Sequence, residues 1–307
     1  MSLSIKCKTL LGSWGLDFSI TCLKSFVLLS DKEITLEIFE DGTLTEDNKK
    51  QLNKEFPGCS IINKVERDKI ISAKLASYPN CLNYRNSTGY AQKLFDIVLY
   101  DEQDVFYIDS DFLFLKKFKL PVFADIPVFM SDTFNAYSFQ PQEFLKIRYP
   151  IFPYINSGIF YFPQKLYDLD YIEQLLKDKT IVNGLVKKIP WLEQTLWAFL
   201  LAKSKKIFYF KHNQIVMAQQ VMKIPVLNNI DDETIAVHLV SSLRNHVFPE
   251  LKKLNVSNDS KKNYKQMDLE AAPKYLSKMS FAVDRLKKKW RQMYPDKIAN
   301  YKINLTR

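Results

Sequence analysis

The chain has 307 residues, of which 47% are hydrophobic and 25% charged. This composition excludes fibrous and disordered proteins and suits one large α/β domain or two small ones. The four cysteines, Cys7, Cys22, Cys59 and Cys81, are scattered and form no C-x-x-C pair. We therefore expect no disulfide framework, no zinc site and a reducing, cytoplasmic location. The apolar runs are too short for a membrane span, and we expect no signal peptide.

Basic residues exceed acidic ones and give a net charge of +10. Much of the excess lies in the C-terminal third, in runs such as LKKL and DRLKKKWRQ. Such charge indicates a solvated basic face, an anionic substrate, a membrane surface or nucleic acid. No RNP pattern and no paired Cys and His residues accompany it, so we do not expect nucleic acid as a partner. We expect most of these lysines to face water.

The first part of the chain alternates strand-like and helix-like patterns. Runs of β-forming residues predict strands at residues 4–12, 33–39, 59–64 and 104–109. Apolar residues at helical spacing predict helices at 16–30, 45–56, 67–78 and 88–100. Thr45, followed by acidic residues, is typical of a helix N-cap. This order predicts an α/β fold with a Rossmann-like half over residues 1–120, in which helices cover both faces of a mainly parallel sheet.

After Pro121 the alternation is less regular. Strands are predicted at residues 126–132, 155–162, 206–210 and 234–240, and helices at 167–178 and 191–203. No linker rich in Pro, Gly or Ser marks a domain boundary. We therefore predict one domain over residues 1–267, with a substrate-facing half at 121–267. A basic helical extension is expected at 268–307, with its helix starting near Asp268.

Two aspartates, Asp109 and Asp111, stand where the apolar strand Val105–Ile108 ends. Ligands of parallel sheets bind beyond the carboxyl ends of the strands. Two convergent carboxylates at such an end suit Mg²⁺ or Mn²⁺, and the alternative is a polar strand end that binds nothing. A second D-x-D, at Asp168 and Asp170, is more typical of a helix start.

Three longer segments resemble a known family: KLFDIVLYDEQDVFYIDSDFLFL, INSGIFYFP and WLEQTLWAF. They are similar to GT-A nucleotide-sugar transferases of the glycogenin-like group, which includes bacterial lipopolysaccharide galactosyltransferases. The resemblance covers about Ile5 to Arg244. It implies a GT-A fold and a retaining glycosyltransferase that uses a nucleotide-sugar donor, with UDP as the expected nucleotide. The acceptor, whether a glycan, a lipid-linked molecule or a protein, is not identified by the sequence.

The resemblance also implies a metal site. Asp109 and Asp111 match the family's D-x-D, which binds the metal and the donor ribose. His238, in TIAVHLV, matches the late histidine that completes the ligand set. A nitrogen ligand shifts the expected ion from Mg²⁺ toward Mn²⁺. The alternative for His238 is a hydrogen-bonded core histidine.

Further positions match donor-binding residues of the family. Tyr90 and Lys93 are one helical step apart, so both can face the donor, and Ser110 lies between the two aspartates. Lys93 is otherwise an exposed lysine. Arg244 stands in a segment that lacks the family's Gly-x-x-Lys-Pro-Trp run and is a candidate for binding the diphosphate.

The sugar-facing side is expected to involve a turn and a helix. Asn156, Ser157 and Gly158 match the family's turn beneath the transferred sugar, although a purely structural turn remains the alternative. Glu193 and Gln194 match the family's Asp-Gln pair, with glutamate as a longer variant, and are the catalytic candidates. Their alternative is the exposed face of a packed helix.

Two further features leave alternatives open. Trp14, in the first loop, is either a base-stacking residue or part of the core. The run EDGTLTED resembles the haloacid-dehalogenase phosphatase motif, but Phe39 stands where the nucleophilic aspartate is required, which excludes that chemistry. A GT-A protein that binds ligands without transferase activity is the remaining alternative.

The basic tail offers two interpretations of its own. Apolar residues lie near one side of the expected helix, with lysines and arginines between them: Leu276, Met279, Phe281, Val283, Leu286 and Trp290. This pattern suits a helix packed on the domain. It equally suits an interfacial helix in peripheral contact with an anionic membrane.

Overall fold

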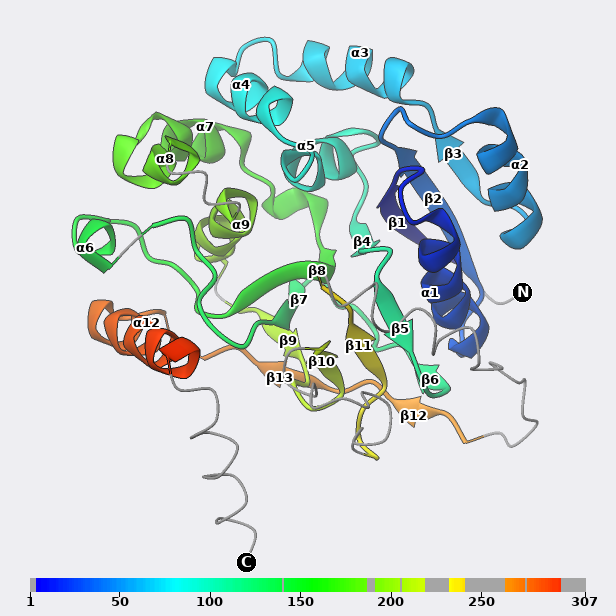
Figure 1. The fold of residues 1–307 in the computed structure, drawn as a ribbon. Coiled ribbons are helices and arrows are strands. Elements are labelled where there is room, and N and C mark those ends of the chain that lie inside the picture. The colour runs from blue at the N-terminus through cyan, green and yellow to red at the C-terminus, as the bar shows by residue number, and fades with distance from the viewer. Residues whose placement is uncertain are drawn as a thin grey trace, which may run out of the picture.

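A computed structural model describes residues 4–139, 141–186, 191–204, 206–218, 232–240, 263–273 and 275–293 (Figure 1). An eight-stranded sheet runs through the domain in the order β13-β9-β7-β8-β4-β1-β2-β3. Its members are β1 (Ile5–Leu11), β2 (Ile34–Glu40), β3 (Ser60–Ile62), β4 (Val105–Ile108), β7 (Val128–Ser131), β8 (Ile155–Phe162), β9 (Phe208–Phe210) and β13 (Leu269–Ala271). Strands β1 to β4 are mutually parallel, whereas β8 runs antiparallel between β4 and β7. The carboxyl ends of β4 and β7 and the amino end of β8 therefore share one edge.

Two small sheets accompany the central one. One has the order β10-β11-β5, from β10 (Ile215–Met217), β11 (Ala236–His238) and β5 (Phe112–Phe114). The other pairs β12 (Lys265–Gln266) with β6 (Phe118–Lys119). Because β5 follows directly after the D-x-D, the first of these sheets brings a distant segment of the chain next to the two aspartates.

Helices pack on both faces of the central sheet (Figure 1). They are α1 (Leu16–Leu29), α2 (Glu46–Glu55), α3 (Lys64–Lys74), α4 (Pro79–Ser87), α5 (Ala91–Leu99), α6 (Pro141–Phe144), α7 (Leu169–Lys177), α8 (Lys179–Val186), α9 (Leu192–Leu201) and α12 (Lys278–Met293), with a 3₁₀ turn at Gln164–Leu166. Side chains alternate across β4: Val105 and Tyr107 join the core beneath α5 and α9, and Phe106 and Ile108 join the core beneath α1. All four are buried.

Two helix starts predicted from local signals are confirmed. Thr45 caps α2 in a capping box with Asn48, and Asp168 caps α7 by accepting a hydrogen bond from the backbone N–H of Tyr171. The mainly parallel sheet with helices on both faces is confirmed as well.

Three helices, α4, α6 and α8, were not predicted, and the tail begins differently. Helix α4 starts at Pro79, and the carboxylate of Glu173, on α7, accepts the backbone N–H groups of Asn80 and Cys81. The capping residue is remote in the sequence, so no local pattern predicts α4. The segment expected to start a helix near Asp268 is instead edge strand β13, antiparallel to β9, and helix α12 starts at Lys278.

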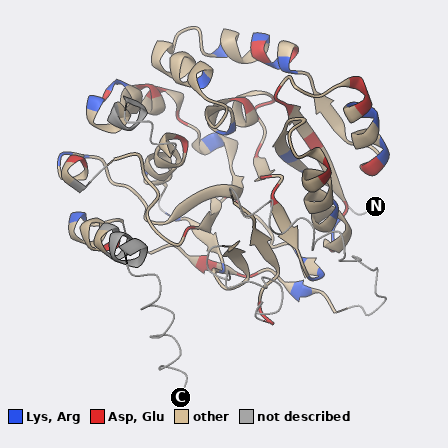
Figure 2. Ribbon diagram, viewed as in Figure 1, with Lys and Arg blue, Asp and Glu red and all other residues tan. Residues whose placement is uncertain are grey.

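Charge is mixed on the outer helices. Figure 2 shows basic and acidic residues interspersed on α2 and α3, so these helices present no surface of a single sign. Inside, Asp96 on α5 is fully buried and accepts hydrogen bonds from Arg85 at 2.6 and 2.9 Å, with Arg67 at 2.8 Å on the same carboxylate. These pairs tie α5 to α3 and α4. In the described part of the chain, no helix combines the length and apolarity needed to cross a bilayer.

Candidate active site at the D-x-D

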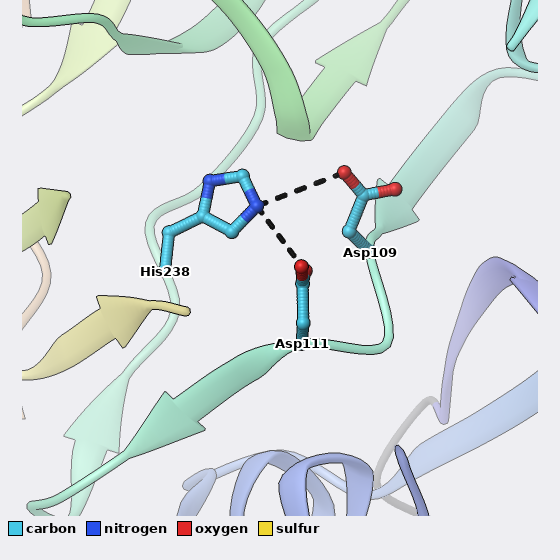
Figure 3. A group of neighbouring side chains, drawn as sticks. All are labelled: Asp109, Asp111 and His238. Atoms are coloured by element: carbon cyan, nitrogen blue, oxygen red, sulfur yellow. Dashed lines mark ion pairs between the residues drawn. The ribbon is translucent and has the colours of Figure 1, made fainter. Parts of the chain in front are cut away.

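Two sheets bring the D-x-D and a late histidine together. Asp109 follows β4, Asp111 precedes β5, and β11 runs antiparallel to β5 so that His238 lies opposite Phe112. The imidazole stacks on the Phe112 ring, with centroids 4.2 Å apart and the rings inclined by 15°. In Figure 3 the imidazole Nε2 points toward both aspartates.

The spacing of these groups fits a divalent cation. His238 Nε2 lies 3.1 Å from Asp111 Oδ1 and 3.9 Å from Asp109 Oδ2 (Figure 3). Adjacent ligands of an octahedral ion with bonds of about 2.1 Å are about 3 Å apart, and opposite ligands about 4 Å apart. All three ligand atoms lie within 4.8 Å of one another, and Asp111 and His238 are buried. The residues therefore fit a Mg²⁺ or Mn²⁺ site.

Asp109 is held by two neighbours. The Tyr107 hydroxyl donates a hydrogen bond to Asp109 Oδ1 at 2.6 Å, and the Lys93 ammonium pairs with Oδ2 at 2.7 Å. Burial alone would lower the pKa of Lys93, but the carboxylates of Asp109 and Glu193 outweigh it and raise that pKa. Lys93 therefore remains a cation beside the D-x-D. The alternative, an exposed lysine, is wrong, because only 12% of the Lys93 side chain is accessible.

Glu193, the second residue of α9, is a buried carboxyl group close enough to Lys93 to interact with its charge. Ser157 donates a hydrogen bond to Glu193 Oε2 at 2.9 Å. Burial raises the pKa of Glu193 to about 7, although Lys93 and the Ser157 hydroxyl stabilise its charged form. Gln194 is buried too, and its amide donates to the carbonyl of Ala136. Neither side chain lies on an exposed helix face.

Asn156, Ser157 and Gly158, which we expected to form a turn, instead lie within strand β8 and shape the site. Asn156 donates from Nδ2 to Asp132 Oδ2 at 3.1 Å, and its Oδ1 accepts the backbone N–H of Gly158 at 2.8 Å. A Cβ at Gly158 would lie 2.6 Å from the His238 ring and 2.9 Å from Phe112. The glycine is thus required by the close approach of the imidazole, and its contact with the sugar stays a prediction.

The remaining candidates lie around this centre. Ser19, on α1, donates a hydrogen bond to the Ser110 hydroxyl at 3.2 Å, and Tyr90 is exposed at the start of α5. Trp14 is 73% exposed in the loop after β1, at the carboxyl edge of the sheet, so it is not a core residue. Arg244 lies outside the described residues.

Comparison with known proteins gives a likeness in structure alone. The sequence matches no protein-family model and no curated protein. The galactosyltransferase LgtC, solved in complex with donor and acceptor sugar analogues, superposes with a TM-score of 0.50 at 14% identity, over 83% of this chain and 98% of LgtC. The chain has a GT-A fold. An active-site mutant of LgtC (TM-score 0.45, 16% identity, 83% and 98% covered) and the bifunctional glycosyltransferase WbbM in its apo form (0.43, 12%, 78% and 46%) are also similar.

Two polar groups of this GT-A site were not singled out from the sequence. In the sequence, Tyr107 looks like any other strand residue, and only the structure shows that its hydroxyl donates to Asp109. Asp132 follows β7, and burial raises its pKa, whereas the Asn156 amide and the Thr133 N–H stabilise its charged form. A polar residue directly after an apolar strand was the available signal for Asp132, as it was for Asp109.

Proposed function

We propose that this GT-A protein is a metal-dependent glycosyltransferase that moves a sugar from a nucleotide-diphosphate donor, UDP-linked, to an acceptor with retention of configuration. The observation that carries the proposal is the cluster of Asp109, Asp111 and His238 with the Lys93 ammonium beside it. Two carboxylates, an imidazole and a buried cation at the carboxyl edge of this sheet suit a diphosphate with its divalent ion.

Each residue has a task in this proposal. Asp109, Asp111 and His238 would hold the ion, for which the nitrogen ligand favours Mn²⁺ over Mg²⁺. The ion supplies charge stabilisation to the leaving diphosphate. Lys93 stabilises the same charge from the protein side, because its raised pKa keeps the ammonium protonated.

The donor's other parts would contact separate elements. Trp14 offers an exposed indole face to a base, and Tyr90 and Ser110 border the donor from α5 and the D-x-D turn. Arg244 stays a candidate for the diphosphate on sequence grounds.

The transferred sugar would lie near α9. Glu193 and Gln194 project from its first turn, and Ser157 orients the Glu193 carboxyl. With a pKa of about 7, Glu193 can exchange a proton or accept hydrogen bonds from sugar hydroxyls at neutral pH. Asn156 and Ser157, at the start of β8, would line the same space.

The exposed face of α12 suggests where in the cell the protein acts. On α12, Phe281 is fully buried against Phe139 and Phe144, so this face of the helix packs on the domain. Met279, Val283 and Leu286 are exposed, whereas the side chain of Trp290 lies outside the described residues. We propose that this exposed face and the neighbouring lysines contact an anionic membrane from the cytoplasmic side, near a lipid-linked or other glycan acceptor. Binding to anionic vesicles at low salt that high salt abolishes would support this; absence of binding at low salt would refute it.

A screen of sugar nucleotides tests the activity. The expected result is release of nucleoside diphosphate that requires Mn²⁺ and stops with a chelator. The matched control is Asp47→Asn, an exposed surface substitution that should leave release unchanged. Binding of sugar nucleotides without any release would instead favour the ligand-binding alternative.

A further inference from the structure

Helix α12 is hydrogen-bonded to a loop that belongs to the site. Asp284, on α12, accepts two hydrogen bonds at Oδ2 from Asn135, one from the backbone N–H at 2.9 Å and one from the side-chain amide at 3.0 Å. Asn135 is 1% exposed. Bonds to a charged acceptor are the stronger kind, so Asp284 fixes both donors of a buried residue.

From Asn135 the chain of hydrogen bonds continues inward. Its Oδ1 accepts the backbone N–H of Tyr154 at 2.8 Å, and the Tyr154 carbonyl accepts the N–H of Asp132 at 2.6 Å. Tyr154 has φ of 56°, a left-handed conformation that a residue other than glycine adopts at a cost. The bonds on either side of Tyr154 offset that cost.

The far end of this chain is the D-x-D. Asp132 holds the Asn156 amide, Asn156 Oδ1 accepts the N–H of Gly158, and the Gly158 carbonyl accepts the N–H of Asp109 at 2.6 Å. The loop at residues 132–139 also carries the Ala136 carbonyl, which accepts the Gln194 amide. Polar groups on two sides of the site therefore depend on where this loop lies.

We propose that Asp284 is a positioning residue for the sugar-facing side of the site, acting through Asn135 on the loop at residues 132–139. The proposal rests on the function proposed above. It assigns a role to the C-terminal helix that packing of Phe281 alone does not provide. The metal-binding side chains have supports of their own: Asp111 and His238 are held by the pairing of β5 with β11, and the Asp109 carboxylate by Tyr107 and Lys93. Loss of Asp284 should thus disturb the sugar side and spare the metal.

The test compares Asp284→Ala with two other variants of the full chain. Asp284→Asn keeps an oxygen acceptor for Asn135, and Asp47→Ala removes a carboxylate of similar size from an exposed position. Hydrogen exchange of peptides covering residues 132–139 is measured by mass spectrometry, and Mn²⁺ affinity by calorimetry. The kcat and KM for Mn²⁺-dependent hydrolysis of the UDP-sugar that the screen identifies complete the set.

For Asp284→Ala, we expect exchange in these peptides to be faster by about tenfold. We expect kcat to fall by about tenfold, since small displacements of positioning groups are costly, with donor KM and Mn²⁺ affinity within about threefold of wild type. Asp284→Asn should restore most of kcat, and Asp47→Ala should match wild type.

Unchanged exchange in Asp284→Ala would overturn the proposal, as would faster exchange with unchanged kcat. If the wild-type protein hydrolyses no sugar nucleotide, the proposed function fails, and the exchange experiment still decides whether Asp284 holds the loop.

Discussion

Replacing Glu193 with glutamine should change how stability depends on pH. Glu193 is buried, and its pKa is raised from 4.5 to about 7. The folded protein therefore binds this proton more tightly than the unfolded chain does. The resulting contribution to the free energy of unfolding is fully present below about pH 4.5 and is lost as the pH rises through about 7.

The size of the effect follows from the shift. A difference of about 2.5 pKa units corresponds to about 3.4 kcal/mol at about 1.4 kcal/mol per unit, and about 3 kcal/mol of this is lost between pH 4 and pH 8. Glutamine resembles the protonated carboxyl, and its oxygen can still accept the Ser157 hydroxyl. Relative to wild type, Glu193→Gln should gain about 3 kcal/mol of stability between pH 4 and pH 8.

Urea unfolding of both proteins at several pH values measures this difference. All other titrating groups are common to the two proteins and largely cancel when their free energies of unfolding are subtracted at each pH. Parallel pH profiles would show that Glu193 titrates like an exposed carboxyl, and the argument from burial would be wrong.

Two further substitutions test the metal centre. His238→Ala should weaken Mn²⁺ affinity by about 10- to 100-fold, as measured by calorimetry, while the thermal transition persists; unchanged affinity would make His238 a core residue only. Gly158→Ala should cost about 1–3 kcal/mol in urea unfolding and weaken Mn²⁺ binding, because the new Cβ would lie 2.6 Å from the His238 ring. Gly89→Ala, whose Cβ would meet nothing within 4 Å, is its control, and equal behaviour of the two glycine variants would contradict this account.

The parts of the site that the sequence predicted are those with a local signal. Asp109 and Asp111 interrupt an apolar strand, and His238 stands in a strand-like run, so residue type and position sufficed to nominate them. Their meeting requires β11 to pair with β5, a long-range choice that no local pattern specifies. The prediction that His238 joins the two aspartates came from the family resemblance.

Other features depended wholly on long-range packing. Asp132 reaches Asn156 because β7 and β8 pair antiparallel. Helix α4 owes its cap to Glu173 on another helix, and the strand at Leu269–Ala271 forms because β9 offers an open edge. In each case the partner that decides the structure is remote in sequence, so local propensity was a weak guide.

The central claim is that the D-x-D binds a nucleotide diphosphate through a divalent ion. Calorimetric titration of UDP into the wild-type protein, with Mn²⁺ and then with a chelator, tests it most directly, and Asp111→Asn is measured in parallel. We expect UDP binding by wild type that requires Mn²⁺ and is lost in Asp111→Asn, although the variant keeps its thermal transition. Equal UDP binding in chelator, or by the folded variant, would contradict it.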